Sequence, residues 1–339
     1  MPNPSRVTLK DIARETGYTV NTVSRALKDR PDISAAAKAR IRAVAEELGY
    51  VYDTVAGSLR SGSTRTIAVI LSDISNPFLA IQVKSIELAA MKHGYSTFII
   101  NTDEDSAAEQ QAILSAYGKK VDGILLCPVQ KDEENVRFLQ KTGLPFVLIG
   151  RHFRGIDTDV VMSDDRKAGR LAGEYLLSKG HREILYIGGW PYISSAADRL
   201  EGFTDACRAA GAEIDPRRVL QVDVKHGAGK RAIGEALARG CPFTAVIAYS
   251  DMLGMEVRCA LLEAMGRGGL AIPIVGFDNI QSRLPLPLEF VSVGMAGDDW
   301  GRHAVRLLLK RLQDGEEAGR HKKIVLGVEL VEYRFHFNG

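Results

Sequence analysis

The chain of 339 residues is longer than one hydrophobic core usually supports, so two or three domains are expected. Its composition, 45% apolar and 25% charged, is that of a soluble globular protein, and a formal net charge of +2 excludes a polycation. The charge is uneven, because residues 1–66 carry 11 Lys and Arg against 7 Asp and Glu, whereas the remainder carries 33 against 35. A small basic head on a near-neutral body indicates a polyanionic partner for the head.

The cysteines and the apolar runs exclude further classes of protein. Four scattered cysteines do not make a disulfide framework, and we expect buried, reduced thiols. The N-terminal stretch MPNPSRVTLKD lacks the apolar region of a secretory signal, and no stretch approaches the roughly 20 apolar residues of a membrane span. We therefore expect a cytoplasmic protein without a membrane partner.

Residues 1–50 form the first predicted domain, a module of three short helices. A hydroxyl side chain precedes each helix and can cap it, and these residues are Thr8, Thr19 and Ser34. Gly17 ends the first helix, because glycine readily adopts the left-handed backbone of a tight turn. Such a module is large enough for a small helical core but too small for a catalytic domain.

Residues 8–27 predict a helix-turn-helix. Five side chains lie on or near the exposed side of its second helix: Val20, Asn21, Thr22, Ser24 and Arg25. Asparagine can pair with adenine and arginine with guanine in a major groove, and short hydroxyl side chains suit phosphate contacts. For the helix pair alone, the alternative is an ordinary helical hairpin with a solvated polar face.

Residues 51–65 form a predicted linker, because their sequence VYDTVAGSLRSGSTR is rich in Ser, Gly and Thr. Within the linker, Val55, Ala56 and Leu59 follow the apolar pattern of one or two helical turns. A helix this short is unstable alone in water, so a partner would have to induce it.

From residue 66 onward, strand-like and helix-like segments alternate, which predicts an α/β body. The expected strands are residues 67–72, 96–100, 123–127, 145–149, 184–189, 219–224, 245–250, 272–277 and 323–331. The expected helices are residues 78–93, 133–141, 168–179, 199–210, 229–238, 252–265 and 300–313, with one more that ends at Tyr117. Because the pattern restarts after residue 161, the expected fold is a small all-α head followed by two tandem doubly wound parallel-sheet lobes.

The body of residues 66–339 is expected to divide into a first lobe of residues 66–161 and 295–318 and a second of residues 162–290 and 320–335. Ligands of such sheets bind beyond the carboxyl ends of the strands, so the cleft between the lobes is the expected ligand site. The glycine-rich run GAGKR lacks the first glycine and the Ser/Thr of a phosphate loop, and no GxSxG or HExxH motif is present. We therefore expect no cofactor, no metal and no catalytic residue.

The run VTLKDIARETGYTVNTVSRALKDRPDISAAAKARIRAVAEELGY resembles the DNA-binding head of LacI-type bacterial repressors. The family signature T-x-x-D-I-A-x-x-x-G-x-S/T, followed by T-V-S-R, is matched by Thr8, Asp11, Ile12, Ala13, Gly17, Thr19, Thr22, Val23, Ser24 and Arg25. Later motifs match in order along the whole chain, namely SDISNPF, AGRLAGEYLLSKGHREILYIGG, DRLEGF, AYSD and VGFDN.

The resemblance implies DNA contacts at particular positions. Base-contacting positions are matched by Val20, Asn21 and Arg25. Phosphate-holding positions are matched by Thr8, Thr19, Thr22, Ser24, Ser34 and Tyr50. Residues 51–65 match a hinge helix, in which Ala56 and Leu59 are the expected DNA-contacting residues, and Leu59 matches a leucine that wedges into the minor groove. Tyr52, Asp53 and Gly57 depart from the family's hinge pattern, which predicts either weaker ordering of the hinge or a greater dependence of that ordering on the dimer.

For the body, the resemblance implies a periplasmic-binding-protein fold that holds a small effector, expected to be a carbohydrate, between its lobes. Arg199 matches an effector-contacting arginine and Asp278 its acidic partner, and both groups suit vicinal sugar hydroxyls. Ser250 and Asp251 stand where the family usually has Asn-Asp.

Two aromatic residues are further candidates for the effector site. Phe78 and Trp190 could stack on a sugar ring, and for Phe78 a core position is the alternative. Val224 and Met295 stand where relatives carry an aromatic residue and a glutamine, so the identity of the effector does not follow from the resemblance.

We therefore expect a homodimeric, ligand-controlled transcription repressor on a pseudo-palindromic operator, because a two-fold dimer imposes its symmetry on its target. A tetramer is not expected, since no apolar heptad run follows the last strand. The alternatives are a sugar-binding protein without a DNA role and a sugar-modifying enzyme. The basic head argues against the first, and the missing nucleophile–base motif argues against the second.

Overall fold

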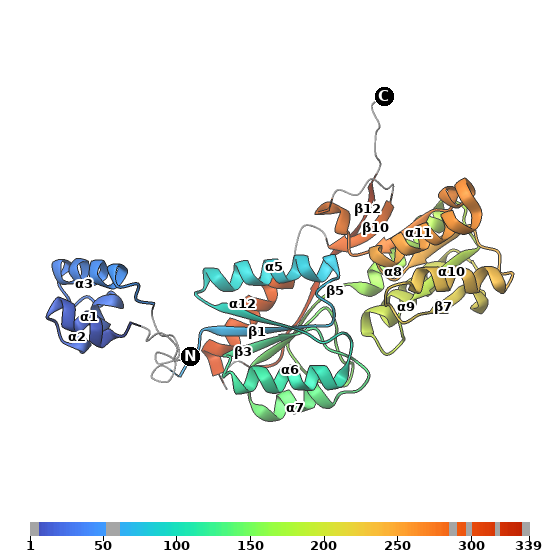
Figure 1. Ribbon diagram of the computed structural model, residues 1–339. Coiled ribbons are helices and arrows are strands. Elements are labelled where there is room, and N and C mark those ends of the chain that lie inside the picture. Colours follow the sequence, from blue (N-terminus) through green and yellow to red (C-terminus); the bar gives the residue numbers. More distant parts are fainter. Residues whose placement is uncertain (1–6, 52–61, 285–289, 296–299, 316–318, 334–339) are drawn as a thin grey trace. The chain divides into compact units, whose positions relative to one another are not determined.

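The computed structural model describes residues 7–51, 62–284, 290–295, 300–315 and 319–333. The chain divides into two compact units, a head of residues 1–64 and a body of residues 65–339 (Figure 1). Most of the predicted hinge lies outside the described residues, including Tyr52, Asp53, Ala56, Gly57 and Leu59.

The head contains the three predicted helices, which are α1 (Leu9–Thr16), α2 (Val20–Leu27) and α3 (Ala35–Glu47). Thr8 and Asp11 cap α1 reciprocally, and the hydroxyls of Thr19 and Ser34 accept hydrogen bonds from the first turns of α2 and α3. Gly17 ends α1 with a φ of 76°, as the turn requires. Six buried apolar side chains from all three helices form the core, namely Ile12, Ala13, Val23, Ala26, Ile41 and Ala45.

The first lobe of the body is built on a six-stranded parallel sheet in the order β11-β5-β4-β3-β1-β2. Its strands are β1 (Thr66–Leu71), β2 (Ser96–Asn101), β3 (Gly123–Leu126), β4 (Phe146–Ile149), β5 (Val160–Ser163) and β11 (Lys323–Leu326). One face packs against α5 (Pro77–Lys92) and α12 (Trp300–Asp314), the other against α6 (Ser106–Gly118) and α7 (Glu134–Thr142) (Figure 1). Both faces are therefore apolar, which explains the continuous apolar runs of the central strands.

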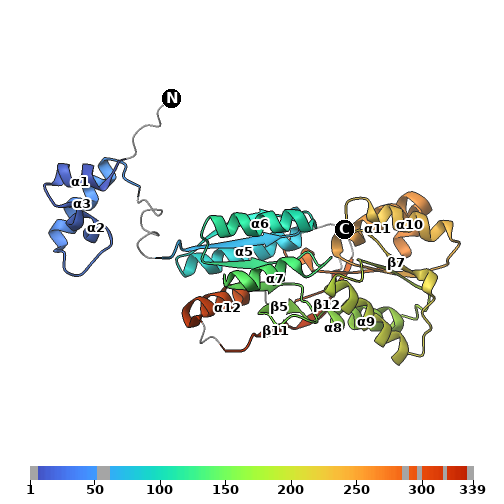
Figure 2. The same cartoon turned by 90° about the horizontal axis from the view of Figure 1, so that it is seen from below.

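The second lobe has the order β12-β10-β9-β8-β6-β7, in which β12 is antiparallel to β10 and the other pairs are parallel. Its strands are β6 (Ile184–Gly188), β7 (Val219–Gln221), β8 (Ala245–Ala248), β9 (Ile274–Phe277), β10 (Phe290–Met295) and β12 (Val328–Tyr333). Figure 2 shows the two helix layers of this lobe. They are α8 (Asp165–Ser178) with α9 (Ser194–Ala209), and α10 (Ala228–Ala238) with α11 (Asp251–Met265). Short 3-10 helices follow at Pro216–Arg218, Gly266–Ala271 and Ile280–Ser282.

The end of the chain differs from the expected single strand over residues 323–331. β11 pairs in parallel with β5 of the first sheet, and after Gly327 the chain continues as β12 in the second sheet. β11 thus belongs to the first lobe, although residues 320–335 were expected in the second. Two short strands, β5 and β10, were also not predicted. In such a brief apolar run, the periodicity of the residues does not distinguish a strand from another buried segment. In the described part of the chain, no helix has the length and apolar character to cross a membrane.

Candidate functional site

The outer side of α2 carries the residues matched to base contacts. Val23 and Ala26 are buried in the head, which turns the opposite side of the helix toward solvent. Asn21 and Arg25 are exposed on that side, and the branched apolar side chain of Val20 is 42% exposed. The helix therefore presents two hydrogen-bonding side chains and one apolar side chain, the chemistry that direct contact with base edges uses.

An ion pair engages Arg25 near the end of α2. Its Nη2 lies 2.6 Å from Oδ2 of Asp32, and both side chains are about half exposed. Ser24, the neighbouring residue, is half-buried. A guanidinium on guanine uses two aligned donors, so the predicted base contact would require Arg25 to share or leave Asp32.

The residues matched to phosphate contacts lie mainly at helix N-termini. Thr8, Thr19 and Ser34 each precede a helix, where unpaired N–H groups and the helix dipole favour an anion. The hydroxyl of Thr22 lies 2.9 Å from that of Thr19, and Tyr50 packs half-buried against the core of the head. At Thr8, Thr19 and Ser34, the helix cap and the predicted phosphate contact therefore involve the same side chain.

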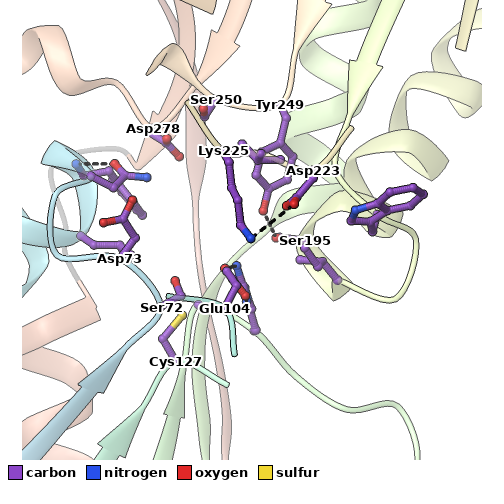
Figure 3. Close-up of a pocket in the computed structure, with 18 of the residues that line it drawn as sticks. Ser72, Asp73, Glu104, Cys127, Ser195, Asp223, Lys225, Tyr249, Ser250 and Asp278 are labelled. Atoms are coloured by element: carbon purple, nitrogen blue, oxygen red, sulfur yellow. Dashed lines mark hydrogen bonds and ion pairs between the residues drawn. The ribbon is translucent and has the colours of Figure 1, made fainter. Parts of the chain in front are cut away.

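In the body, a cleft of about 390 Å³ is lined by both lobes. The first lobe contributes residues that follow β1, β2 and β4, among them Ser72, Asp73, Asn76, Asp103, Glu104 and Arg151. The second lobe contributes residues that follow β6, β7, β8 and β9, among them Trp190, Tyr192, Asp223, Lys225, Tyr249, Ser250 and Asp278. In Figure 3, Ser72, Glu104 and Cys127 lie on one side of the cleft and Ser250 and Asp278 on the other. Parallel strands end here, where the topology predicts a ligand.

Arg199 of α9 is the buried cation on the second-lobe side, with 11% of its side chain exposed. Its Nε donates to Oδ1 of Asp165 over 2.7 Å, and its Nη1 donates to the carbonyl oxygen of Tyr249 over 2.6 Å. Its Nη2 lies 3.9 Å from Oδ1 of Asp278, and the guanidinium lies 4.5 Å from the centroid of the Phe277 ring. The structure thus brings together Arg199 and Asp278, the pair expected from the sequence.

Burial changes the acid–base properties of the carboxyl groups around Arg199. It raises the pKa of Asp165 to about 6, against the attraction of the guanidinium. It also raises the pKa of Asp278 well above its ordinary value, with Arg199 opposing the shift and Asp251 adding repulsion. Asp278 has a φ of 101°, a strained backbone for a residue other than glycine. A carboxyl group that exchanges between charged and protonated forms can both accept from and donate to a hydroxyl.

The close packing of α8 and α9 brings Asp165 to Arg199. A Cβ at Gly169 would lie 1.9 Å from the backbone oxygen of Arg199, and one at Gly202 would lie 1.8 Å from that of Arg166. Glycine at both positions is therefore required for the two helix backbones to approach this closely. The contact places the start of α8 beside the second turn of α9.

Ser250 and Asp251 have different surroundings. Ser250 lines the cleft, and its hydroxyl caps α11 by accepting from the N–H of Leu253. Asp251 is not among the residues that line the cleft. Its carboxylate accepts hydrogen bonds from the Ser292 hydroxyl over 2.7 Å and from the Ile280 N–H over 2.9 Å. These bonds join α11 to the chain around β10, which indicates a structural role for Asp251, and the expected effector contact stays a prediction.

Replacing Asp251 by alanine should lower the free energy of unfolding by about 1–3 kcal/mol, because buried donors from Ser292 and Ile280 would lose their acceptor. Asp251→Asn retains one acceptor oxygen and should cost less. Urea unfolding followed by circular dichroism measures both variants. An alanine variant as stable as the parent would contradict the structural role.

Aromatic rings line the cleft from both lobes. Phe78 packs edge-on against Trp300, with ring centroids 4.9 Å apart, and it also contacts the core of the first lobe. The core position considered for Phe78 is therefore observed, and its stacking on a sugar ring stays a prediction. Trp190 lines the cleft and is 38% exposed. Trp300 was not predicted, although it is one of only two tryptophans and begins the last expected helix.

A second buried cation, on the first-lobe side, was also not predicted. Arg151 forms a two-pronged ion pair with Glu104, with N–O distances of 2.6 and 2.9 Å, and donates to the carbonyl oxygen of Pro128. Burial would raise the pKa of Glu104, but the charge of Arg151 and hydrogen bonds from Arg151 and Ser72 hold it below its ordinary value. Both residues follow predicted strands, so the strand-end rule that located the cleft could have identified them.

Comparisons with known proteins match both units of the chain. The family described as "Bacterial regulatory proteins, lacI family" matches residues 8–53, and "Periplasmic binding proteins and sugar binding domain of LacI family" matches residues 64–326. The transcriptional regulator DegA of Bacillus subtilis is 31% identical over 338 residues, covering 96% of this chain and 97% of DegA. The transcriptional repressor CytR of Escherichia coli is 29% identical over 332 residues, covering 96% of this chain and 94% of CytR.

Solved structures share the fold along most of the chain. A complex of the transcriptional regulator CelR with cellobiose has a TM-score of 0.71 at 28% identity and covers 96% of this chain and 99% of its own. A lac repressor dimer bound to operator and the anti-inducer ONPF has a TM-score of 0.83 and covers 96% of this chain and 98% of its own. At 23% identity, the similarity to the lac repressor dimer shows a shared fold alone.

Proposed function

This chain belongs to the LacI family of bacterial regulatory proteins, and we propose that it is a transcriptional repressor whose operator affinity is controlled by a sugar bound between two lobes. One observation carries the proposal. A single chain combines a helix-turn-helix with an exposed polar second helix and a cleft lined by paired charges and aromatic rings. The helix-turn-helix suits DNA, and the cleft suits a polyhydroxy ligand.

The effector in this proposal is a saccharide. The CelR complex, at 28% identity, contains cellobiose, which supports this ligand class. Arg199 and Asp278 would hold neighbouring hydroxyl groups, and Ser250 would add a hydroxyl contact. Apolar ring faces for a sugar come from Phe78, Trp190 and Trp300.

The DNA-binding form in this proposal is a cytoplasmic homodimer on a pseudo-palindromic operator. Residues 1–50 would contact DNA, residues 51–65 would form the hinge, and residues 66–339 would bind the effector and the second subunit. A two-fold dimer presents two equivalent heads, so its operator needs two inverted half-sites. Sedimentation of a stable tetramer at micromolar concentration would contradict the dimer.

We also infer that the chain is a regulator and not an enzyme, and that it uses no cofactor. This inference is supported by DegA and CytR, which are transcriptional regulators over nearly the whole length of this chain. A sugar-binding protein without a DNA role is the remaining alternative. Deletion of residues 1–65 separates the two, because a repressor loses operator binding and keeps saccharide binding.

Saccharide binding should change the intrinsic tryptophan fluorescence, because both tryptophans of the chain, Trp190 and Trp300, line the cleft. A thermal-shift screen of mono- and oligosaccharides would find the ligand, since a ligand at 100 times its Kd stabilises the fold by about 2.7 kcal/mol. Fluorescence titration and operator binding are then measured with that saccharide. Trp190→Phe should remove the contribution of the more exposed tryptophan to the fluorescence change. A panel that changes neither fluorescence nor operator affinity would refute the effector assignment.

A further inference from the structure

Acidic side chains outnumber basic ones in the cleft. Among the described residues that line it, the acidic ones are Asp73, Asp103, Glu104, Asp165, Asp223 and Asp278. The lysine and arginine residues are Arg151, Arg199 and Lys225. An anion that enters the cleft therefore meets more carboxyl groups than ammonium or guanidinium groups.

Both buried guanidinium groups already have acidic partners. Two nitrogens of Arg151 are bound by Glu104, and one of them also donates to a backbone carbonyl. Arg199 donates to Asp165 and to a backbone carbonyl, and its remaining nitrogen faces Asp278. The charge of each guanidinium is therefore already balanced by a carboxylate, with which a phosphate or a carboxylate of the ligand would have to compete.

The third cation, Lys225, is also near an acidic side chain and lies largely in solvent. Its Nζ is 3.5 Å from Oδ2 of Asp223, and 65% of its side chain is exposed. Figure 3 shows this pair at the cleft. An exposed ammonium that water and salt screen adds little attraction for an anion.

We propose that the cleft excludes phosphorylated and carboxylated sugars, and that Glu104 is the residue that enforces this selection. The proposal rests on the proposed function, because it concerns the ligand of the same cleft. An anion would have to displace Glu104 from Arg151 or lie beside its carboxylate, where like charges repel. A neutral hydroxyl donates and accepts, so it can join the existing ion pairs without displacing either partner.

Glu104→Gln tests the role of this carboxylate. Glutamine has nearly the same shape and keeps one acceptor for Arg151, but it leaves the positive charge of the guanidinium uncompensated. The matched control is Asp105→Asn, which removes the same charge one residue away. Asp105 caps α6 and does not line the cleft, and asparagine retains the capping oxygen.

The experiment is calorimetric titration of the full-length protein with matched pairs of neutral and anionic probes. The pairs are glucose with glucose 6-phosphate, ribose with ribose 5-phosphate, and cellobiose with cellobionate. In each pair that binds, we expect the anionic member to bind at least about tenfold more weakly than the neutral one. Glu104→Gln should reduce this ratio by about tenfold or more, and Asp105→Asn should leave it unchanged.

Two results would overturn the proposal. One is an anionic probe that binds the parent protein as tightly as its neutral partner. The other is a Glu104→Gln variant that still binds the neutral probe and has the same ratio of neutral to anionic affinity as the parent protein. If no probe of either kind binds, and none alters operator affinity, the proposed sugar control fails and the selection proposal fails with it.

Discussion

Replacing Arg199 by alanine is expected to lower the free energy of unfolding by about 3–5 kcal/mol near pH 8, because the change leaves buried carboxyl groups without their cation. Arg199 is 11% exposed, and the side chains of its partners Asp165 and Asp278 are 3% and 6% exposed. The carbonyl oxygen of Tyr249 also loses its donor. Urea unfolding followed by circular dichroism measures the loss.

The pH dependence of this loss has a defined sign. Asp165 has a folded pKa of about 6, above its ordinary value of 3.8, so it contributes stability at low pH that is lost as the pH rises through about 6. Without Arg199 this pKa rises further, and so does that of Asp278. The difference in stability between parent and Arg199→Ala should therefore shrink as the pH falls from 8 to 5.

Two further variants separate stability from effector binding. Arg208→Ala, on the same helix, is the control, because Arg208 is 75% exposed and its described ion pair, with Asp205, lies at the surface. Asp278→Asn resembles the protonated carboxyl group, so it should fold normally. It should nevertheless weaken saccharide binding by about ten- to a hundredfold if the saccharide binds the charged form of Asp278, because asparagine cannot supply a charge-assisted contact to a hydroxyl. Unchanged saccharide affinity in folded Asp278→Asn would show that other residues hold the effector.

Replacing Arg25 by alanine is expected to weaken operator binding by about 2–6 kcal/mol for the proposed dimer, because each of two heads loses about 1–3 kcal/mol. The side chain is exposed on α2, and its only described ion pair is with Asp32. The loss should be concentrated at one base position of each half-site. Fluorescence anisotropy with the operator and its single-base variants, at one fixed salt concentration, measures both effects.

The control for Arg25 is Arg42→Ala, which removes the same charge from α3 of the same head. Arg42 pairs with Asp29 and does not lie on the recognition helix. It should leave the base preference unchanged, whatever its effect on overall affinity. An Arg25→Ala variant with parental affinity and base preference would refute the assignment of α2 as the recognition helix.

The sequence by itself determined the elements and the general place of the site. Hydroxyl caps at Thr8, Thr19 and Ser34 and the turn at Gly17 defined the helices of the head, because these signals act within one turn of helix. Long apolar runs gave most of the strands, since a strand buried on both faces needs apolar residues throughout. The alternation of strands and helices then predicted a ligand site at the strand ends, where the cleft lies.

Apart from the expected pair of Arg199 and Asp278, only the tertiary structure decided which side chains meet and where the chain changes sheets. Arg199 pairs with Asp165, 34 positions earlier, because two glycines let α8 and α9 approach closely. Arg151 pairs with Glu104 across 47 positions, and Asp251 is engaged by Ser292 across 41. At Gly327 one apolar run becomes two strands in different sheets, although its residue pattern does not change. Local patterns set the periodicity of an element, whereas these pairings follow from the packing of elements distant in sequence and from the need of buried charges for partners.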